Sequence, residues 1–214
     1  MRGLPFLLTF LLFNLTVDAQ QEWFTMDAQQ FWQTKEVNEI IDPNNFSRSL
    51  LEAALFHAGN ETRLKKGKPA LAWNPTLNKS ARHQSELMAN SGKLSHSWRK
   101  PADSRQLVDR VKLFGGSFQA LGENIAQFYL LDIPEYEEYS FHSGIFTNKQ
   151  GQKIANKSYK KLAQECIDAW MNSKGHRENL LYPFQEIGTG VSFWVKNKRG
   201  LNLDIYLSQN FATP

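Results

Sequence analysis

The feature that most constrains the fold is a helical spacing of apolar residues in the last third of the chain. Between positions 158 and 173, six residues recur at intervals of three and four: Tyr159, Leu162, Ala163, Cys166, Ile167 and Trp170. This spacing places all six on one face of an α-helix. Such a face is stable only when another layer covers it. The segment therefore predicts a helix that packs within a layered domain.

Two earlier segments also favour helices. Apolar residues at helical spacing predict a helix over residues 46–65. Asn74 followed by Pro75 is typical of a helix start, and Gly92 is typical of a helix end, so a second helix is expected between them. A short amphipathic piece is expected around residues 108–114.

The remaining pattern favours strands at the end of the chain. Residues 118–129 are interpreted as a strand, a turn at Gly122-Glu123-Asn124, and a continuing strand. Residues 187–195 and 201–211 are expected to form an antiparallel hairpin across a turn at 196–200. Helices that precede an antiparallel hairpin predict an α+β domain rather than a parallel βαβ repeat.

Composition limits the class of protein. The chain has 214 residues, 41% hydrophobic and 21% charged, which suits a globular domain and excludes a disordered or fibrous chain. Its formal net charge of +4 comes from scattered residues and not from a dense basic stripe. A nucleic-acid partner is therefore not expected.

The amino-terminal end is interpreted as an export signal over residues 1–19. Arg2 precedes an apolar run from Leu4 to Leu15, and Val17-Asp18-Ala19 resembles a cleavage site. The alternative is an uncleaved anchor, but a bilayer span needs about 20 apolar residues. A secreted, extracellular or periplasmic protein is expected, with no transmembrane segment in the mature chain. Residues 20–45 form an extension, and residues 46–214 form one domain with an insertion at about 130–157.

Cys166 is the only cysteine, so a disulfide framework is excluded. For an exported protein, this favours a bacterial source. Cys166 could act as a nucleophile with His176, but its place on an apolar helix face favours a buried structural thiol.

Several short motifs together resemble the CAP superfamily of cysteine-rich secretory, antigen 5 and pathogenesis-related proteins, also called SCP domains. The resemblance covers about residues 48–212. It rests on Asn60 and Arg63, Leu71-Ala72-Trp73-Asn74 with Leu77, Leu94-Ser95-His96-Ser97, Gly122-Glu123-Asn124, the run from Ser173 to Leu180, and Ile187-Gly188-Thr189-Gly190-Val191. It implies a three-layer α-β-α sandwich around a three-stranded antiparallel sheet. The form of the motif after Trp170 resembles the bacterial branch, which lacks disulfides.

The resemblance also implies a cleft lined by two histidines and two acidic residues that binds a divalent metal in some members. His96 and His176 match the two histidines, and Glu123 matches one acid. The second acidic position is Ser173 here, which departs from the family pattern. Asn124, beside Glu123, is expected to line the same cleft.

Three functions follow as hypotheses. The first is a non-catalytic binding module whose cleft holds a divalent cation such as zinc together with an unknown small ligand, lipid, glycan or protein. The second is a metal-assisted hydrolase of peptide or cell-envelope material in which Glu123 is the catalytic base. The third is a structural surface protein with a vestigial cleft. No organic cofactor is expected.

Overall fold

The computed structural model describes residues 21–133, 138–142, 145–193 and 204–214. The predicted export signal and the predicted turn at 196–200 lie outside these residues. The helices are α2 (Ala28–Gln33), α3 (Lys35–Asn38), α4 (Arg48–Lys65), α5 (Pro75–Ser91), the 3₁₀ turn η1 (Ala102–Ser104), α6 (Leu107–Leu113), α7 (Tyr159–Asn172) and α8 (Lys174–Leu181). The strands are β1 (Ala72–Trp73), β2 (Ala120–Tyr129), β3 (Tyr139–His142), β4 (Ile145–Asn148), β5 (Glu186–Phe193) and β6 (Asp204–Thr213).

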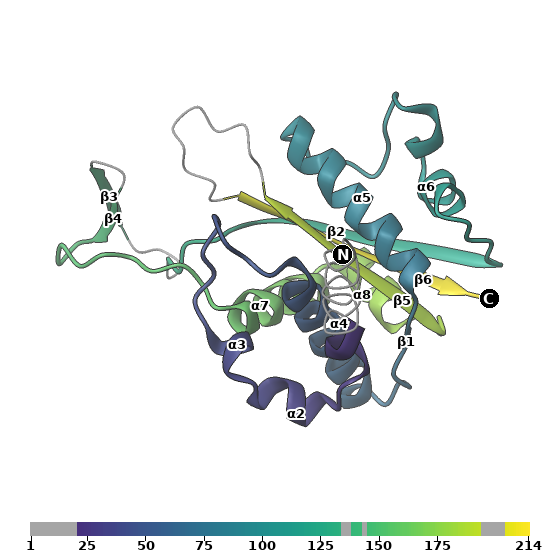
Figure 1. Ribbon diagram of the computed structural model, residues 1–214, viewed down its shortest axis with the longest axis horizontal. Helices are drawn as coiled ribbons and strands as arrows, with labels where there is room; N and C mark the ends of the chain where they lie inside the picture. The colour runs from purple at the N-terminus through teal and green to yellow at the C-terminus, as the bar shows by residue number, and fades with distance from the viewer. Residues whose placement is uncertain (1–20, 134–137, 143–144, 194–203) are drawn as a thin grey trace, which may run out of the picture.

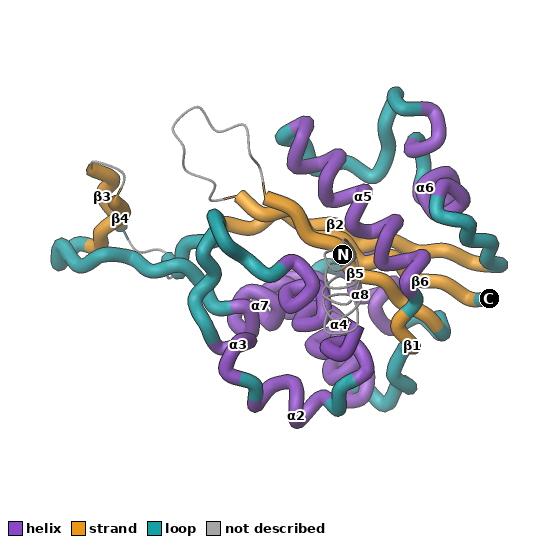
Figure 2. Tube along the Cα trace, viewed as in Figure 1, coloured by secondary structure: helices purple, strands orange, loops and turns teal. Residues whose placement is uncertain are grey.

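The expected α-β-α sandwich is confirmed. Figures 1 and 2 show α5 and α6 on one side of the sheet and α4, α7 and α8 on the other. The helices expected over 46–65, 75–91 and 158–173 are present as α4, α5 and α7. Cys166 lies fully buried in α7, as its apolar neighbours indicated.

The expectation of three strands is wrong, because the described residues form a sheet of four, in the order β1-β5-β6-β2. The additional strand is β1, which pairs in parallel with β5 through Ala72 and Trp73, so the sheet is mixed. A strand of two residues shows no alternation that a sequence pattern could reveal. Asn60 on α4 fixes it, because its side chain both donates to the Leu71 carbonyl and accepts from the Leu71 N–H.

One local interpretation is also corrected. The turn expected at Gly122-Glu123-Asn124 is absent, since β2 is continuous and pairs with β6 along its whole length. Polar residues in the middle of a strand resemble a turn signal, but here Glu123 and Asn124 are buried and hydrogen-bonded. The polar run after Ser173, for which the sequence predicted no element, forms the helix α8.

The layers meet most closely where α5 crosses β5. A Cβ atom at Gly188 would lie 2.0 Å from the Asn78 backbone nitrogen, and one at Gly190 would lie 2.1 Å from the Ala81 carbonyl carbon. Both distances are far below any real contact, so only glycine allows the helix backbone to lie directly on the strand. This close approach explains the Gly188-Thr189-Gly190 segment, which the sequence assigned to a strand.

The amino-terminal extension packs on α4. Phe31, Val37 and Ile41 are fully buried in the main core. The Phe31 ring stacks on the imidazole of His57 at 4.2 Å between centroids, and His57 Nε2 lies 2.7 Å from the Trp23 carbonyl oxygen. In Figure 1 the extension runs beneath α4, on the side of the sandwich away from α5.

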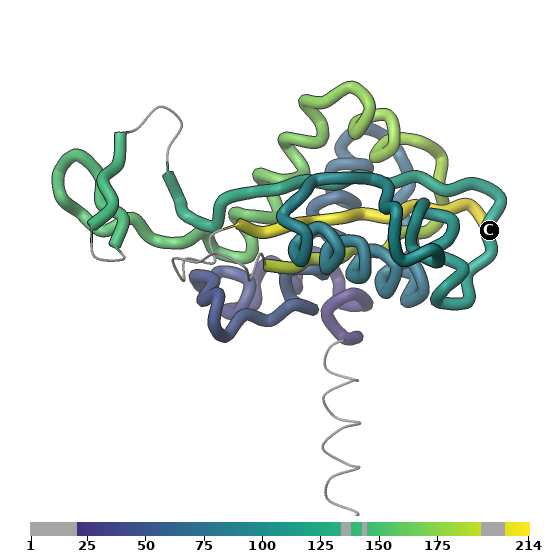
Figure 3. The backbone as a smooth tube through the Cα atoms, turned by 90° about the horizontal axis from the view of Figure 1, so that it is seen from above, coloured from purple at the N-terminus to yellow at the C-terminus, as the bar shows by residue number. Residues whose placement is uncertain are grey.

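The β3–β4 hairpin lies within the predicted insertion and pairs antiparallel from Tyr139 with Asn148 to His142 with Ile145. Figure 3 shows it projecting from one end of the domain. Its strand residues are exposed or half-buried, including the rings of Tyr139 and Phe141.

Candidate functional site

The centre of the candidate site is the carboxylate of Glu123, which lies in the middle of β2 and is buried. Its Oε1 lies 2.9 Å from His96 Nδ1, and its Oε2 accepts from Arg110 Nη2 at 2.6 Å. Because an ionised carboxylate can only accept, His96 donates from Nδ1 and keeps the lone pair of Nε2 free. The His96 side chain is 56% exposed, so this free nitrogen is accessible to a ligand.

Arg110 fixes the positions of Glu123 and His96. Its side chain is fully buried on α6, and its Nη1 also donates to the carbonyls of His96 and Ser104, each at 3.3 Å. A buried guanidinium needs a negative partner, and a buried carboxylate needs a positive one. The pair therefore ties the loop that carries His96 to the sheet.

The second predicted histidine is brought to the same region by α8. Asn124, the neighbour of Glu123 on β2, donates to the His176 backbone carbonyl at 3.0 Å. Asn179 donates to the Glu123 carbonyl at 3.1 Å and to Asn124 Oδ1 at 3.0 Å, so it joins α8 to the strand. The fixed backbone of α8 thereby positions the His176 ring, which is half-buried.

The electrostatics of the two histidines are coupled. Burial, together with the neighbouring positive charge that His96 can carry, lowers the pKa of His176. This shift favours the neutral imidazole of His176, which is the form that binds metal. Contacts join His96 to Glu123, and Asn124 to the backbone of His176, so the four residues lie in one region.

The described residues do not form a closed metal site. Within the described residues, no group of three or more His, Cys, Asp or Glu side chains is arranged to hold a metal ion. Both Glu123 oxygens already have partners, so the carboxylate orients His96 and is not free to coordinate. The available ligands are two imidazoles. A carboxylate that accepts from the second nitrogen of a ligand histidine is common at zinc sites, because it fixes the ring and raises its basicity.

Ser173 occupies the junction between α7 and α8. Its backbone N–H donates to the Ala169 and Trp170 carbonyls, and its side chain makes no capping bond. It supplies no second carboxylate. Sequence reasoning missed Arg110 altogether. The only available signal was an arginine within an amphipathic segment, beside the buried Val111.

The chain belongs to the CAP family. Residues 56–211 match the model of the cysteine-rich secretory protein family, which covers well over half of the chain. This chain has a single cysteine and so no internal disulfide, which agrees with the bacterial form of the motif after Trp170.

A relative and two solved structures extend the comparison. The chain is 32% identical over 155 residues to the uncharacterized protein YkwD of Bacillus subtilis, with 70% of this chain and 47% of the relative covered. The chain thus spans about half the length of that relative. An extracellular SCP-domain protein of Bacillus anthracis is similar with a TM-score of 0.53 and 23% identity, over 78% of this chain and 41% of that chain. An outer surface protein of Borrelia burgdorferi gives a TM-score of 0.49 and 18% identity, over 75% and 90% of the two chains. Among the described residues, no helix combines the length and apolar character that a membrane span requires.

Proposed function

We propose that this protein is an exported CAP-family binding module in which His96 and His176 hold a divalent cation, with zinc the best match. The observation that carries the proposal is the orientation of His96. Its Nδ1 is committed to Glu123, and its accessible Nε2 is left as a ligand atom near the neutral imidazole of His176. Two imidazoles leave coordination positions of zinc for water or for a ligand.

The contacts that Glu123 makes favour a binding role over hydrolysis. A general base must accept a proton from water, but the two oxygens of Glu123 are held by His96 and by the buried cation Arg110. Ser173 supplies no second carboxylate. Hydrolysis therefore remains the less favoured alternative, and a purely structural protein is the third.

An exported location is part of the proposal. It is supported by the apolar segment after Arg2 and by the similar Bacillus anthracis protein, which is described as extracellular. The cation would supply a positive centre for an anionic or carbonyl-bearing ligand, while Glu123 and Arg110 keep His96 in position.

Calorimetric titration of metal-stripped protein with zinc tests the proposal. His96→Ala and His176→Ala are each expected to weaken zinc binding at least about tenfold, and His142→Ala, an exposed histidine on the β3–β4 hairpin, is the matched control. Circular dichroism checks that each variant folds. Equal binding by all four proteins, or no binding by the unaltered protein, would refute the metal site.

Catalysis is tested separately on the zinc-loaded protein with peptide and cell-wall substrates. No turnover is expected. Turnover that depends on zinc and disappears in Glu123→Gln would establish the hydrolase alternative instead.

A further inference from the structure

A cavity of about 240 Å³ lies beside the first half of α5. It is lined by Gln21, Phe24, Ser49, Trp73, Pro75, Asn78, Lys79 and Arg82. His96, Glu123, Asn124 and His176 do not line it. Trp73 lies on β1 at one edge of the sheet, whereas Glu123 lies on β2 at the other edge. The cavity is therefore a separate feature from the proposed metal site.

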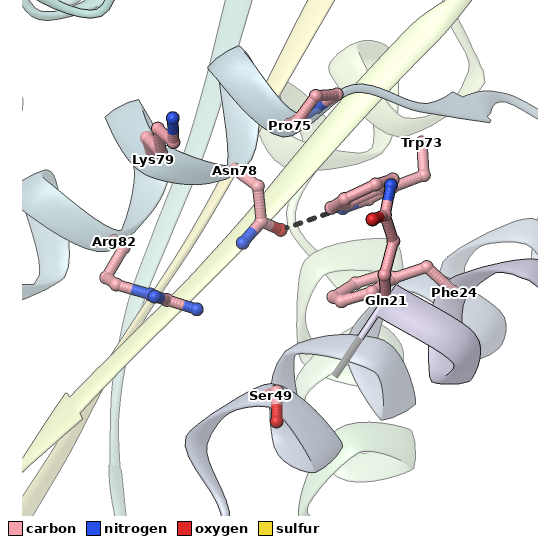
Figure 4. A pocket seen from close by; sticks show the side chains of 8 residues that line it. All are labelled: Gln21, Phe24, Ser49, Trp73, Pro75, Asn78, Lys79 and Arg82. Carbon is pink, nitrogen blue, oxygen red and sulfur yellow. Dashed lines mark hydrogen bonds between the residues drawn. The ribbon is translucent and has the colours of Figure 1, made fainter. Parts of the chain in front are cut away.

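One side of the cavity is apolar. The rings of Phe24 and Trp73 stack at 4.7 Å with an interplanar angle of 17°, and Pro75 adjoins them. Figure 4 shows both rings extending into the view from the same side. Phe24 comes from the amino-terminal extension, so this wall exists only when the extension is docked. Such a wall favours contact with a ring.

The other side carries positive charge. In Figure 4 the guanidinium of Arg82 extends toward the two rings from the opposite side. Its Nε and Nη2 donate to the buried carboxylate of Glu52 at 2.9 and 2.5 Å. The side chain is still 35% exposed, and Nη1 has no partner within the described residues, so a donor remains for a ligand.

Lys79 contributes the net positive charge beside the cavity. Glu52 pairs with Arg82, and Glu86 pairs with Arg48. Within the described part of the chain, no carboxylate lies within ion-pair distance of Lys79. These five groups therefore leave one net positive charge beside the cavity. The first turns of α4 and α5, which hold Ser49 and Pro75, add the positive ends of two helix dipoles.

We propose that this cavity binds a small carboxylate that carries a single ring, with the ring against Phe24 and Trp73 and the carboxylate at Arg82 and Lys79. The volume is below the 300–1,000 Å³ typical of drug-sized ligands, which limits the ligand to about one ring. An aromatic acid and a uronic-acid sugar share this chemistry. The buried Glu52 sits behind Arg82, where it orients the guanidinium and repels no ligand directly.

Two matched pairs of probes test the proposal by calorimetry on the purified protein: phenylacetate with phenylacetamide, and glucuronate with glucuronamide. Each pair differs only in the charge of the acid group. At least one carboxylate is expected to bind about tenfold more tightly than its amide, because a charge-assisted contact is lost in the amide. The pair that shows the difference identifies the ligand as an aromatic or a sugar acid.

Lys79→Ala is expected to weaken binding of that carboxylate severalfold and to leave the amide unaffected. Lys112→Ala, an exposed lysine on α6, is the matched control. The Trp73 indole N–H signal, assigned in labelled protein through Trp73→Phe, should shift on binding. Equal affinity for acid and amide, no binding by either acid up to about 10 mM, or binding that shifts only signals near His176 would overturn the proposal.

Discussion

The guanidinium of Arg110 donates to one oxygen of the Glu123 carboxylate, and the His96 imidazole lies against the other. One carboxylate thus bridges a fully buried cation and a largely exposed ring. The same arginine donates to the His96 backbone carbonyl, so it positions both the side chain and the main chain of the histidine through separate contacts. The position of His96 therefore depends on a residue that no ligand would touch.

Loss of Arg110 should be strongly destabilising. Arg110→Met removes the partner of a buried carboxylate, and breaking such a pair lowers the free energy of unfolding by about 3–5 kcal/mol. Urea denaturation measures the change. Adding Glu123→Gln to the same chain should recover part of the loss, because the unpaired charge is removed. If Glu123→Gln lowers the free energy of unfolding by the same amount in the Arg110→Met chain as in the unaltered protein, the two side chains are not coupled.

Replacing glycine by alanine should have different effects on stability at two positions, one at the α5–β5 crossing and one away from it. Gly190→Ala places a methyl group against the Ala81 backbone, which cannot move without displacing α5. We expect a loss of at least about 3 kcal/mol, beyond ordinary overpacking. Gly175→Ala is the control, because it lies in α8 and a Cβ atom added there would meet no other atom within 4 Å. That substitution should be neutral or stabilising by up to about 1 kcal/mol. Thermal denaturation of both variants checks the contrast.

The amino-terminal extension should contribute to the stability of the whole domain. Phe31 is fully buried against His57, so Phe31→Ala is expected to lower the free energy of unfolding by about 3–5 kcal/mol. Phe141→Ala on the exposed hairpin removes a ring of the same size and should change it by less than about 1 kcal/mol. Similar small effects at both positions in chemical denaturation would mean that the extension is not part of the cooperative unit.

His57 should make stability depend on pH. Burial lowers the pKa of His57, although the nearby Glu61 and Asp27 oppose the shift. Above the ordinary value of 6.5, neither the folded nor the unfolded chain holds the proton. Below 6.5 the unfolded chain takes it up first, so the free energy of unfolding falls until the lower folded pKa is reached.

The measurement is urea denaturation at a series of pH values on both sides of 6.5. His57→Gln should flatten the decline at acid pH, since glutamine can still donate to the Trp23 carbonyl. His83→Gln removes a half-buried histidine whose pKa is also lowered by burial, and it should leave the decline that depends on His57 unchanged. An identical pH profile for the unaltered protein and His57→Gln would contradict the prediction.

Cys166 provides a chemical probe of unfolding. Burial raises the pKa of its thiol well above the usual value, and no part of the side chain is exposed. Because the thiolate is the reactive form, the native protein should not react with a thiol reagent. Reaction should follow the global unfolding rate, and Phe31→Ala should accelerate it. Rapid labelling of native protein would show that α7 opens locally.

The helices were predictable because the residues that define each helix lie within its own segment of the sequence. Each of α4, α5 and α7 has its own apolar spacing and cap, and Asn74 caps α5 as its place before Pro75 indicated. The strand β1 was not predictable in this way, since its two residues are defined by pairing with β5. The continuous course of β2 likewise depends on β6, and not on its own polar centre.

The candidate site was only partly predictable for the same reason. His96, Glu123 and His176 stand in recognisable motifs, and the structure gathers them. Arg110 stands in none, and its role arises from a contact with a carboxylate on another element. The cavity at the start of α5 was equally hidden, because Phe24, Trp73 and Arg82 come from three separate segments.

The place of β6 in the sheet bears on when the domain can fold. This strand lies between β5 and β2 and pairs with both, yet it follows every other described element along the chain. A ribosome-bound chain in which residues 204–213 have not yet emerged has β2 without its partner in the sheet and an unfilled centre between the helical layers. The domain therefore completes its sheet only after all the other described elements have been made, which keeps the emerging chain open until this strand is released.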